Sequence, residues 1–395
     1  MAAIEIGKDI VWVGALDWDR RLFDELIPLP DGTTYNAYIV RGRDKTALID
    51  AVDPSKSGEL LANLQEAGVR RIDYLVSQHA EQDHSGAIGD ILDLFPEAKV
   101  VTNEKCKAML IDLLRLPEER FQVVGDGGTL DLGGRTLEFL LMPWVHWPET
   151  MVTWLREERV LFSCDFLGAH LAQCRPLLCD EHRTLEAAKR YFAEIMLPFR
   201  LQIRKHLERL AKMDIAMIAP SHGVVYPAPA LILDAYRDWA GEATKNTALI
   251  PFVSMHGSTR EMVEHLSGAL IRQGVCVVPC NLVQTDIGEL AKELVDASTV
   301  ILATPTVLGG PHPAVAYAAV LANALRPKTK FATVIGSYGW GGRVVESLTA
   351  SLGNLKVELL EPVLAKGLPV EKDFQALDRL AAAVADKHRS LGVLP

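Results

Sequence analysis

The chain has 395 residues, which is more than one ordinary hydrophobic core holds, so we expect two domains. Its net charge of −10, with no cluster of basic residues, argues against a nucleic-acid partner. No run of about 18 apolar residues and no signal-peptide pattern occurs, which predicts a cytoplasmic protein that does not span a membrane.

The first half combines paired strand-like runs with helix-like segments. The strand-like pairs are 33–42 with 45–53, and 129–142 with 151–165, and the helix-like segments are 56–68, 84–95, 104–115 and 184–212. Closely spaced strands favour antiparallel pairing. We therefore predict a layered α/β sandwich with much antiparallel sheet over residues 1–246.

The segment "SQHAEQDHSG" (77–86) holds the densest group of metal-ligating side chains. An apolar strand is predicted to end at His79, and Glu81 and Asp83 follow at alternate positions, so one extended turn can point all three side chains the same way. His84 is adjacent to Asp83, and because neighbouring side chains diverge, the segment can serve two metals. Histidine with carboxylate suits borderline and harder metals, whereas a structural zinc site usually has cysteine.

Three further candidate ligands follow apolar strand-like runs. They are His146 in "MPWVHWPETM", Asp165 in "LFSCDFLGAH" and His222 in "IAMIAPSHG". Each alone is compatible with an ordinary turn residue. Ligands at several strand ends can meet along one edge of a sheet, so together they predict a metal centre.

The six cysteines contain no C-x-x-C pair, so we expect no iron–sulfur or rubredoxin-type site. They are interpreted as buried free thiols. In particular, Cys276 and Cys280 lie in "VCVVPC", which resembles a buried strand.

The second half alternates strands and helices regularly. Strand-like runs begin at 248, 275, 299, 330 and 356, and helix-like segments are 259–273, 286–297, 313–325, 341–352 and about 370–390. This alternation is typical of a doubly wound, five-stranded parallel sheet of the flavodoxin-like kind. The polar stretch 240–246 marks the join, which gives domains at 1–246 and 247–395.

Three loops of the second half suit a flavin phosphate and ring. "VSMHGSTREM" follows the first strand and opens a helix, so its hydroxyls, backbone N–H groups and helix N-terminus can hold a phosphate. It has no lysine, which excludes a Walker-type site. The loops "TPTVLGGPHP" and "GSYGWGG" end the third and fourth strands, beside the first strand at the point where strand order reverses.

These motifs together resemble the flavodiiron, or A-type flavoprotein, family, which joins a metallo-β-lactamase-like αβ/βα domain to a flavodoxin-like domain. The motifs "HAEQDHSGA", "HWPETM", "LFSCDFLGAH" and "APSHG" carry the resemblance in the first half, and it extends over essentially the whole chain. Zinc hydrolases of this fold have H-x-H-x-D-H. Here Glu81 replaces the second histidine, and added negative charge with a hard oxygen donor favours iron.

The resemblance implies a ligand set for two non-haem irons. His79, Glu81 and His146 would bind one iron, His84 and His222 the other, with Asp83 also a ligand and Asp165 bridging the pair. In some members the residue that matches His84 turns away from the metal. Gln78 and Cys164 stand where members often carry asparagine.

The resemblance also implies FMN as the second cofactor. The residues predicted to bind FMN are Ser254, Met255, His256, Gly257, Ser258, Thr259, Thr304, Pro305, Thr306, Leu308, Gly309, Gly310, Ser337, Tyr338, Gly339, Trp340 and Gly341.

The function implied is reduction of O2 to water, of NO to N2O, or of both. FMN would relay electrons from an external donor such as rubredoxin or its reductase, within a head-to-tail homodimer. Two alternatives stay open: a zinc-dependent hydrolase fused to a flavodoxin-like domain, and an electron-transfer or sensing flavoprotein with a vestigial metal fold. Measuring which metal is bound distinguishes the zinc hydrolase from the gas reductase. Measuring O2 and NO consumption distinguishes the electron-transfer or sensing flavoprotein from it.

Overall fold

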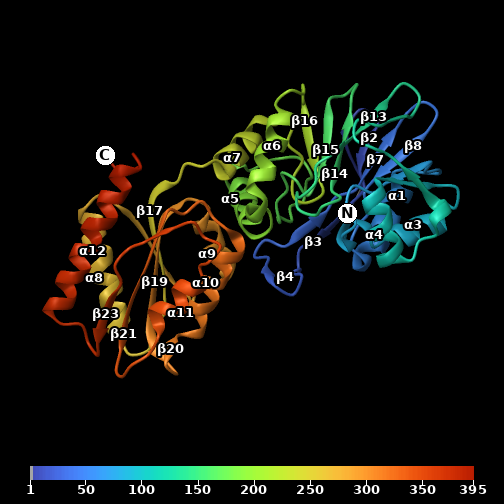
Figure 1. Ribbon diagram of the computed structural model, residues 1–395. Helices are drawn as coiled ribbons and strands as arrows, with labels where there is room; N and C mark the ends of the chain where they lie inside the picture. The colour runs from blue at the N-terminus through green and yellow to red at the C-terminus, as the bar shows by residue number, and fades with distance from the viewer. Residues whose placement is uncertain (1–2) are drawn as a thin grey trace. The chain divides into compact units, whose positions relative to one another are not determined.

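The computed structural model describes residues 3–395 (Figure 1). The chain divides into two compact units. The first contains the described residues up to Tyr191 together with Phe199–Ala240, and the second contains Phe192–Pro198 and Gly241–Pro395. The domain limits of 1–246 and 247–395 stay a prediction.

The first unit is built on two β-sheets. The larger sheet has the order β1 (Ile4–Gly7), β2 (Ile10–Trp12), β7 (Tyr38–Arg41), β8 (Thr46–Ile49), β9 (Tyr74–Val76), β10 (Lys99–Thr102) and β11 (Phe121–Val123). The smaller has the order β12 (Thr129–Asp131), β13 (Thr136–Leu141), β14 (Met151–Leu155), β15 (Val160–Cys164) and β16 (Met217–Pro220). Two short pairs complete it, β3 (Ala15–Asp17) with β6 (Thr33–Tyr35), and β4 (Leu22–Phe23) with β5 (Ile27–Pro28).

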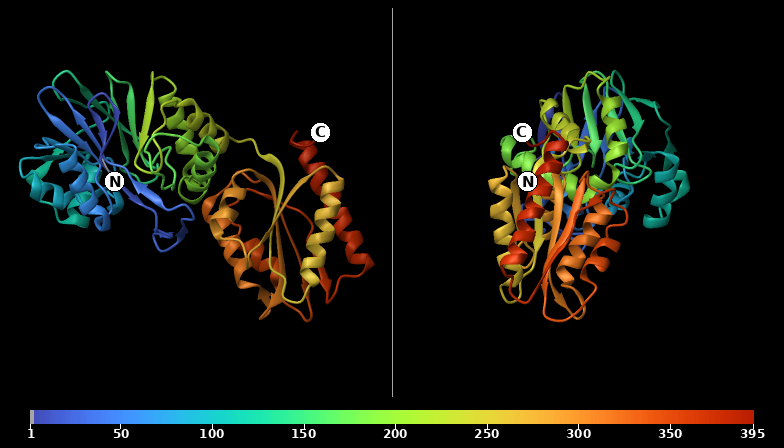
Figure 2. Two further views of the ribbon diagram at one scale, coloured as in Figure 1. Left: turned by 180° about the vertical axis from the view of Figure 1, so that it is seen from behind. Right: turned by 60° about the vertical axis from the view of Figure 1, so that its left-hand side comes forward.

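Alternation along the strands explains the layers of this unit. In β7, Tyr38 and Val40 belong to a cluster that also contains Phe139 and Phe162 of the smaller sheet, whereas Ile39 belongs to a second cluster with the helices. Successive side chains point to opposite faces of a strand, so one face packs on the other sheet and one on helices. Figures 1 and 2 show α1 (Ser57–Glu66), α3 (Ile88–Leu94) and α4 (Glu104–Leu114) on one side, and α5 (Glu181–Tyr191), α6 (Arg200–Leu210) and α7 (Ala230–Ala240) on the other. The predicted αβ/βα sandwich is confirmed.

Two predicted helices of this unit are wrong in extent. The segment 184–212 is α5, then a π-helical turn at Phe192–Met196 and a 3-10 turn at Leu197–Phe199, and then α6. Pro198 explains the break, because it lacks a backbone donor and disfavours helical geometry at the residue before it. The segment 84–95 is likewise divided, into α2 (Gln82–Ser85) and α3.

The second unit is a doubly wound sheet of five strand positions. Its order is β18 (Cys276–Asn281), β17 (Lys245–Phe252), β19 (Ala297–Val307), β21 (Phe331–Tyr338), and then β22 (Glu358–Leu359) and β23 (Val363–Lys366), which both pair with β21. These pairs are parallel, and the two-residue β20 (Gly310–Pro311) adds an antiparallel hairpin to β19. The flavodoxin-like prediction is confirmed, although the predicted fifth strand is two short ones.

Helices cover both faces of this sheet (Figure 2). On one face lie α8 (Ser258–Arg272) and α12 (Glu371–Ser390), and on the other α9 (Ile287–Leu294), α10 (Pro313–Leu325) and α11 (Val344–Ala350). Apolar residues of β17, β19 and β21 form one core with α8 and α12.

The prediction of buried thiols is wrong for half of the cysteines. Cys106, Cys164 and Cys280 are buried, but Cys174, Cys179 and Cys276 are exposed. Cys276 lies on β18, which occupies the edge of the sheet. The sequence of an apolar edge strand looks like that of a central strand. Which of the two it is depends on the order of strands in the sheet, and that order is set by long-range pairing.

Gly336 allows the close approach of β21 to β19. A Cβ atom there would lie 2.0 Å from the backbone oxygen of Thr304. We expect Gly336→Ala to lower the free energy of unfolding by about 3 kcal/mol, the upper end for overpacking, because a backbone atom of a central strand cannot move aside. Thermal unfolding measures this, with Gly353→Ala as control, since the nearest atom to its added Cβ lies at 3.7 Å. Equal melting temperatures for the two variants would contradict the prediction.

Candidate functional site

All seven predicted ligands converge in the first unit, in two adjacent groups. One group contains His79, Glu81, His146 and Asp165, and the other contains Asp83, His84 and His222. Within each group one potential ligand atom per residue lies within 4.8 Å of the others. The structure therefore brings the seven predicted residues together, although β9 ends at Val76, three residues before His79.

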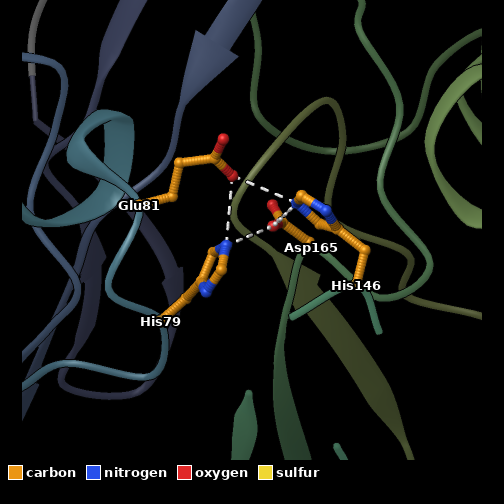
Figure 3. A group of neighbouring side chains, drawn as sticks. All are labelled: His79, Glu81, His146 and Asp165. Carbon is orange, nitrogen blue, oxygen red and sulfur yellow. Dashed lines mark hydrogen bonds and ion pairs between the residues drawn. The ribbon is translucent and has the colours of Figure 1, made fainter. Parts of the chain in front are cut away.

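The first group surrounds the carboxylates of Glu81 and Asp165 with imidazoles (Figure 3). Glu81 Oε2 lies 3.1 Å from His79 Nε2 and 3.1 Å from His146 Nε2. Asp165 Oδ2 lies 3.4 Å from His79 Nε2 and 3.3 Å from His146 Nε2. The four side chains thus point at a common centre.

The second group lies on the other oxygen of Asp165. Oδ1 is 2.8 Å from His84 Nε2 and 3.4 Å from His222 Nε2. Asp83 closes this group, with Oδ2 3.0 Å from His222 Nε2. Asp165 therefore presents one oxygen to each group, which is the arrangement that a bridging carboxylate requires.

The unsatisfied polar atoms of the cluster fit a pair of metal ions. Both carboxylate oxygens of Asp83 and Asp165 and both ring nitrogens of His84 are buried and make no hydrogen bond of good geometry; apart from His84 Nδ1, they face only the oppositely charged atoms of the same cluster. Buried polar atoms are costly unless paired or bound to metal. Imidazole and carboxylate donors without cysteine match non-haem iron better than structural zinc.

Residues that the sequence analysis overlooked hold the histidines from behind. Glu149 Oε1 lies 2.7 Å from His79 Nδ1, and the carbonyl of Thr34 lies 2.6 Å from His222 Nδ1. Each contact leaves Nε2 free to face the metal position. Glu149 stands in the quoted "HWPETM" motif, three residues past His146, which was the available signal.

Asp50 joins three strand ends behind the cluster. Its Oδ1 accepts from Gln78 N at 2.8 Å, and its Oδ2 accepts from Gln78 Nε2 at 2.8 Å and from Ser221 Oγ at 2.9 Å. Asp50 follows β8, Gln78 precedes His79, and Ser221 precedes His222. The carboxylate thereby sets the spacing of two turns that carry candidate ligands, and the side-chain amide of Gln78 occupies the position at which the resembling family often has asparagine.

A pocket of about 500 Å³ opens next to the cluster. Phe23, Asp24, Glu81, Asp83 and Trp147 are among the residues that line it. Burial and the nearby carboxylates of Glu81 and Asp83 raise the pKa of Asp24 to about 6. Two candidate ligands, one from each group, therefore line this pocket: Glu81 and Asp83.

His170 and Tyr191 pack beside this cluster as buried rings. His170 Nδ1 lies 2.8 Å from Thr33 Oγ1, and its ring centroid is 4.9 Å from that of His222. Tyr191 is 4.9 Å from His170 by ring centroids. Both rings pack against the candidate ligand His222.

The three predicted FMN loops line one pocket of about 300 Å³ in the second unit. Its walls are Ser254, Met255, His256, Ser258, Thr259, Pro305, Thr306, Ser337, Tyr338, Gly339 and Gly367. Thr259 Oγ1 and Ser337 Oγ lie 3.1 Å apart and join two of the loops. Gly257 has a φ of 98° and open space around an added Cβ, which suits a tight loop around a phosphate.

The remaining predicted FMN residues do not line this pocket. They are Gly257, Thr304, Leu308, Gly309, Gly310, Trp340 and Gly341. Thr304 is buried and its hydroxyl accepts from His312 N at 2.9 Å, whereas Leu308 and Trp340 are 95% and 69% exposed. Gly367, which the sequence analysis missed, follows β23 and donates to the Tyr338 carbonyl at 2.9 Å.

Comparison with known proteins decides the family. A family profile described as ODP family beta lactamase matches residues 33–223. The chain is 36% identical to a coenzyme F420H(2) oxidase of Methanothermobacter marburgensis, over 97% of this chain and 99% of the relative. It is 34% identical to a nitric oxide reductase of Moorella thermoacetica, over 97% and 99%. The solved rubredoxin oxygen:oxidoreductase of Desulfovibrio gigas superposes with a TM-score of 0.94 at 31% identity, covering 98% of this chain and 99% of that one. The chain belongs to the flavodiiron protein family.

In this flavodiiron protein, His84 points into the metal cluster. Its Nε2 lies 2.8 Å from Asp165, so the ring has the orientation of a ligand. Its Nδ1 makes no hydrogen bond, in contrast to His79 and His222. His84 is therefore the least firmly held of these three histidines.

Among the described residues, no helix of the protein is long and apolar enough to cross a membrane.

Without metal, the flavodiiron cluster binds protons in its place. Burial disfavours the charged form of His79, but hydrogen bonds to Glu149 and Glu81 and the charge of Asp165 raise its pKa to about 10. Burial likewise opposes charge on His84 and His146, and the surrounding carboxylates raise the pKa of each to about 10. The pKa values of Glu81 and Asp165 are lowered against burial by these histidines.

These shifts predict how the metal-free protein responds to pH. Groups with raised pKa stabilise the fold fully below their unfolded value of 6.5 and lose that contribution as pH rises towards about 10. We expect the melting temperature of metal-free protein to fall steadily between these limits. The metal-loaded protein, whose ligand protons are displaced, is the control and is expected to fall less. A metal-free melting temperature that stays level or rises over this range would contradict the prediction.

Proposed function

We propose that this protein reduces O2 to water, NO to N2O, or both, at a diiron site in its first unit, with FMN relaying electrons in the second. The observation that carries the proposal is Asp165, which faces one ligand group with each oxygen. The names of the relatives, nitric oxide reductase and rubredoxin oxygen:oxidoreductase, support the two gases as substrates. Each O2 takes four electrons and four protons to give two waters, and two NO take two electrons and two protons to give N2O and water.

The two groups of side chains correspond to two metal positions. We assign His79, Glu81 and His146 to one iron and Asp83, His84 and His222 to the other, with Asp165 bridging. When bound, the irons supply a coordination position for the gas and exchange electrons with it. Glu81 and Asp165 would place two negative charges next to the bound metal and so favour its ferric state. Phe23 and Trp147 make part of the adjacent pocket apolar.

The FMN assignment rests on the pocket formed by the three loops. We propose that the hydroxyls of Ser254, Ser258 and Thr259 and the N-terminus of α8 hold the phosphate. The loops after β19 and β21 would then flank the ring. Residues 1–246 would thus form the diiron domain and residues 247–395 the FMN domain.

We propose an external one-electron donor such as rubredoxin, and a head-to-tail homodimer. One relative is named for F420H(2), a different donor, so the donor is a point for experiment. The dimer is supported by large apolar side chains exposed on the predicted FMN loops: Met255 is 53%, Leu308 95% and Trp340 69% exposed. Exposed apolar patches of this kind mark interaction surfaces. Sedimentation equilibrium of the holoprotein tests the dimer, and a monomer at micromolar concentration would reject it.

The decisive experiment is gas consumption by reduced protein shown to contain iron and FMN. O2 and NO are added separately, with either reduced rubredoxin or F420H(2) as donor. Rapid use of one gas and slow use of the other identifies the physiological reaction, and the donor that sustains it identifies the partner. If neither gas is consumed with either donor, the reductase assignment is wrong, and zinc content with hydrolase activity would support the zinc-hydrolase alternative.

A further inference from the structure

Glu149 stands behind the metal cluster, in contact with a ligand but not with the metal positions. Its Oε1 lies 2.7 Å from His79 Nδ1 and also accepts from the backbone N–H of Ala80 at 3.1 Å. The side chains of Glu149 and His79 are both completely buried. The opposite ring nitrogen, Nε2, faces Glu81 and Asp165. Glu149 is therefore joined to the cluster through the ring of His79.

The backbone of Glu149 is fixed by neighbouring elements. Its carbonyl accepts from Asn103 Nδ2 at 2.7 Å, and Asn103 Oδ1 caps α4 by accepting from Cys106 N at 3.1 Å. Two residues further on, Met151 N donates to the Gln78 carbonyl at 3.0 Å, just before His79. The carboxylate therefore approaches His79 from a rigid position.

Three of the four histidines of the cluster, His79, His84 and His222, differ in what contacts their Nδ1 atom. His222 donates to a neutral carbonyl, that of Thr34, and His84 Nδ1 has no partner. His79 alone of these three has a carboxylate behind it. A buried carboxylate is expensive, and Glu149 Oε2 has no hydrogen-bond partner to offset the cost. Carboxylate–histidine pairs of this kind fix the orientation of the ring and increase its basicity as a metal ligand. The charge of Glu149 can therefore act on the metal through the ring of His79.

We infer that Glu149 is a positioning residue of the metal centre, which holds His79 in the Nδ1-protonated form with Nε2 directed at the metal. It thereby makes the position formed by His79, Glu81 and His146 the tighter of the two. The inference rests on the proposed function, since it concerns binding of the irons assigned there.

The test is iron retention by Glu149→Gln, which removes the charge but keeps the shape and an acceptor oxygen. Its matched control is Glu158→Gln, in the turn between β14 and β15, where Glu158 Oε1 lies 2.7 Å from Arg135 Nε. Both variants and the wild type are loaded with iron-57 anaerobically and dialysed against a graded chelator. We expect 10–100-fold weaker retention at one iron position in Glu149→Gln, seen as loss of one Mössbauer component, and wild-type behaviour in the control. Glu149→Asp, which restores the charge, should recover part of the loss.

The outcomes separate this inference from the proposed function. Wild-type protein that takes up no iron would reject the function itself. Wild-type protein with two irons and Glu149→Gln with equal retention at both positions would overturn the role of Glu149 alone. If Glu149→Gln does not fold, nitrogen-15 histidine NMR of zinc-loaded wild type decides, because the inference requires His79 to carry its proton on Nδ1. A proton on Nε2, or rapid exchange of the Nδ1 proton with solvent, would overturn it.

Discussion

Asp165→Asn is expected to abolish gas reduction. The amide keeps the size of the side chain but offers one oxygen, so it cannot present an oxygen to each ligand group. We expect turnover to fall by more than the ~100-fold that loss of an outer hydrogen-bond partner costs, together with loss of iron. Without metal, three imidazoles with pKa values of about 10 would lose their shared carboxylate. Breaking a buried ion pair costs about 3–5 kcal/mol, so metal-free Asp165→Asn should also unfold more readily.

Turnover with a gas electrode, iron content and thermal unfolding are measured on the same preparations. Asp73→Asn is the control, because Asp73 is also largely buried and accepts from Thr46 N at 2.9 Å but lies outside the cluster. We expect Asp73→Asn to lower the free energy of unfolding but to keep the wild-type iron content and turnover. If Asp165→Asn keeps its full iron content and turns over gas as fast as Asp73→Asn, Asp165 does not bridge the metals.

Glu81→His is expected to convert the iron site into a zinc site. The change restores the H-x-H-x-D-H pattern and exchanges a hard anionic donor for a neutral imidazole. Zinc has no redox chemistry, so O2 and NO turnover should fall to that of iron-free protein while FMN stays bound. Cells supplied with equal iron and zinc provide the material, and the ratio of the two metals in purified protein is measured.

The control for this substitution is Glu119→His, which adds a histidine at an exposed position of the same unit. It should retain the wild-type ratio of iron to zinc. A Glu81→His protein that still selects iron would show that Glu81 does not set the metal preference, and the assignment would then depend on the shared carboxylate of Asp165.

Local patterns were sufficient to predict most of the fold. Apolar runs separated by polar turns located the strands of both units, and alternation of strand and helix predicted the parallel order around β17. The errors lie where local pattern and long-range context differ. A continuous helix was predicted through Phe192–Phe199, where Pro198 interrupts it, and β18 was predicted to be buried although it lies at the sheet edge.

The sequence by itself determined the chemistry of the site. The density of ligands from His79 to His84 indicates a metal centre, and the resemblance to the flavodiiron family, with Glu81 in place of a histidine, implies iron rather than zinc. These conclusions depend on side-chain identity and short spacing, which a sequence displays directly.

Only the tertiary structure decided how the ligands are oriented. Glu149 is 70 residues from His79, and the carbonyl of Thr34 is 188 residues from His222. Asp165 likewise faces one ligand group with each carboxylate oxygen only because turns from distant strands meet around it. Hydrogen bonds of this kind join segments that meet only after both sheets have packed, so neither periodicity nor motif spacing contains them.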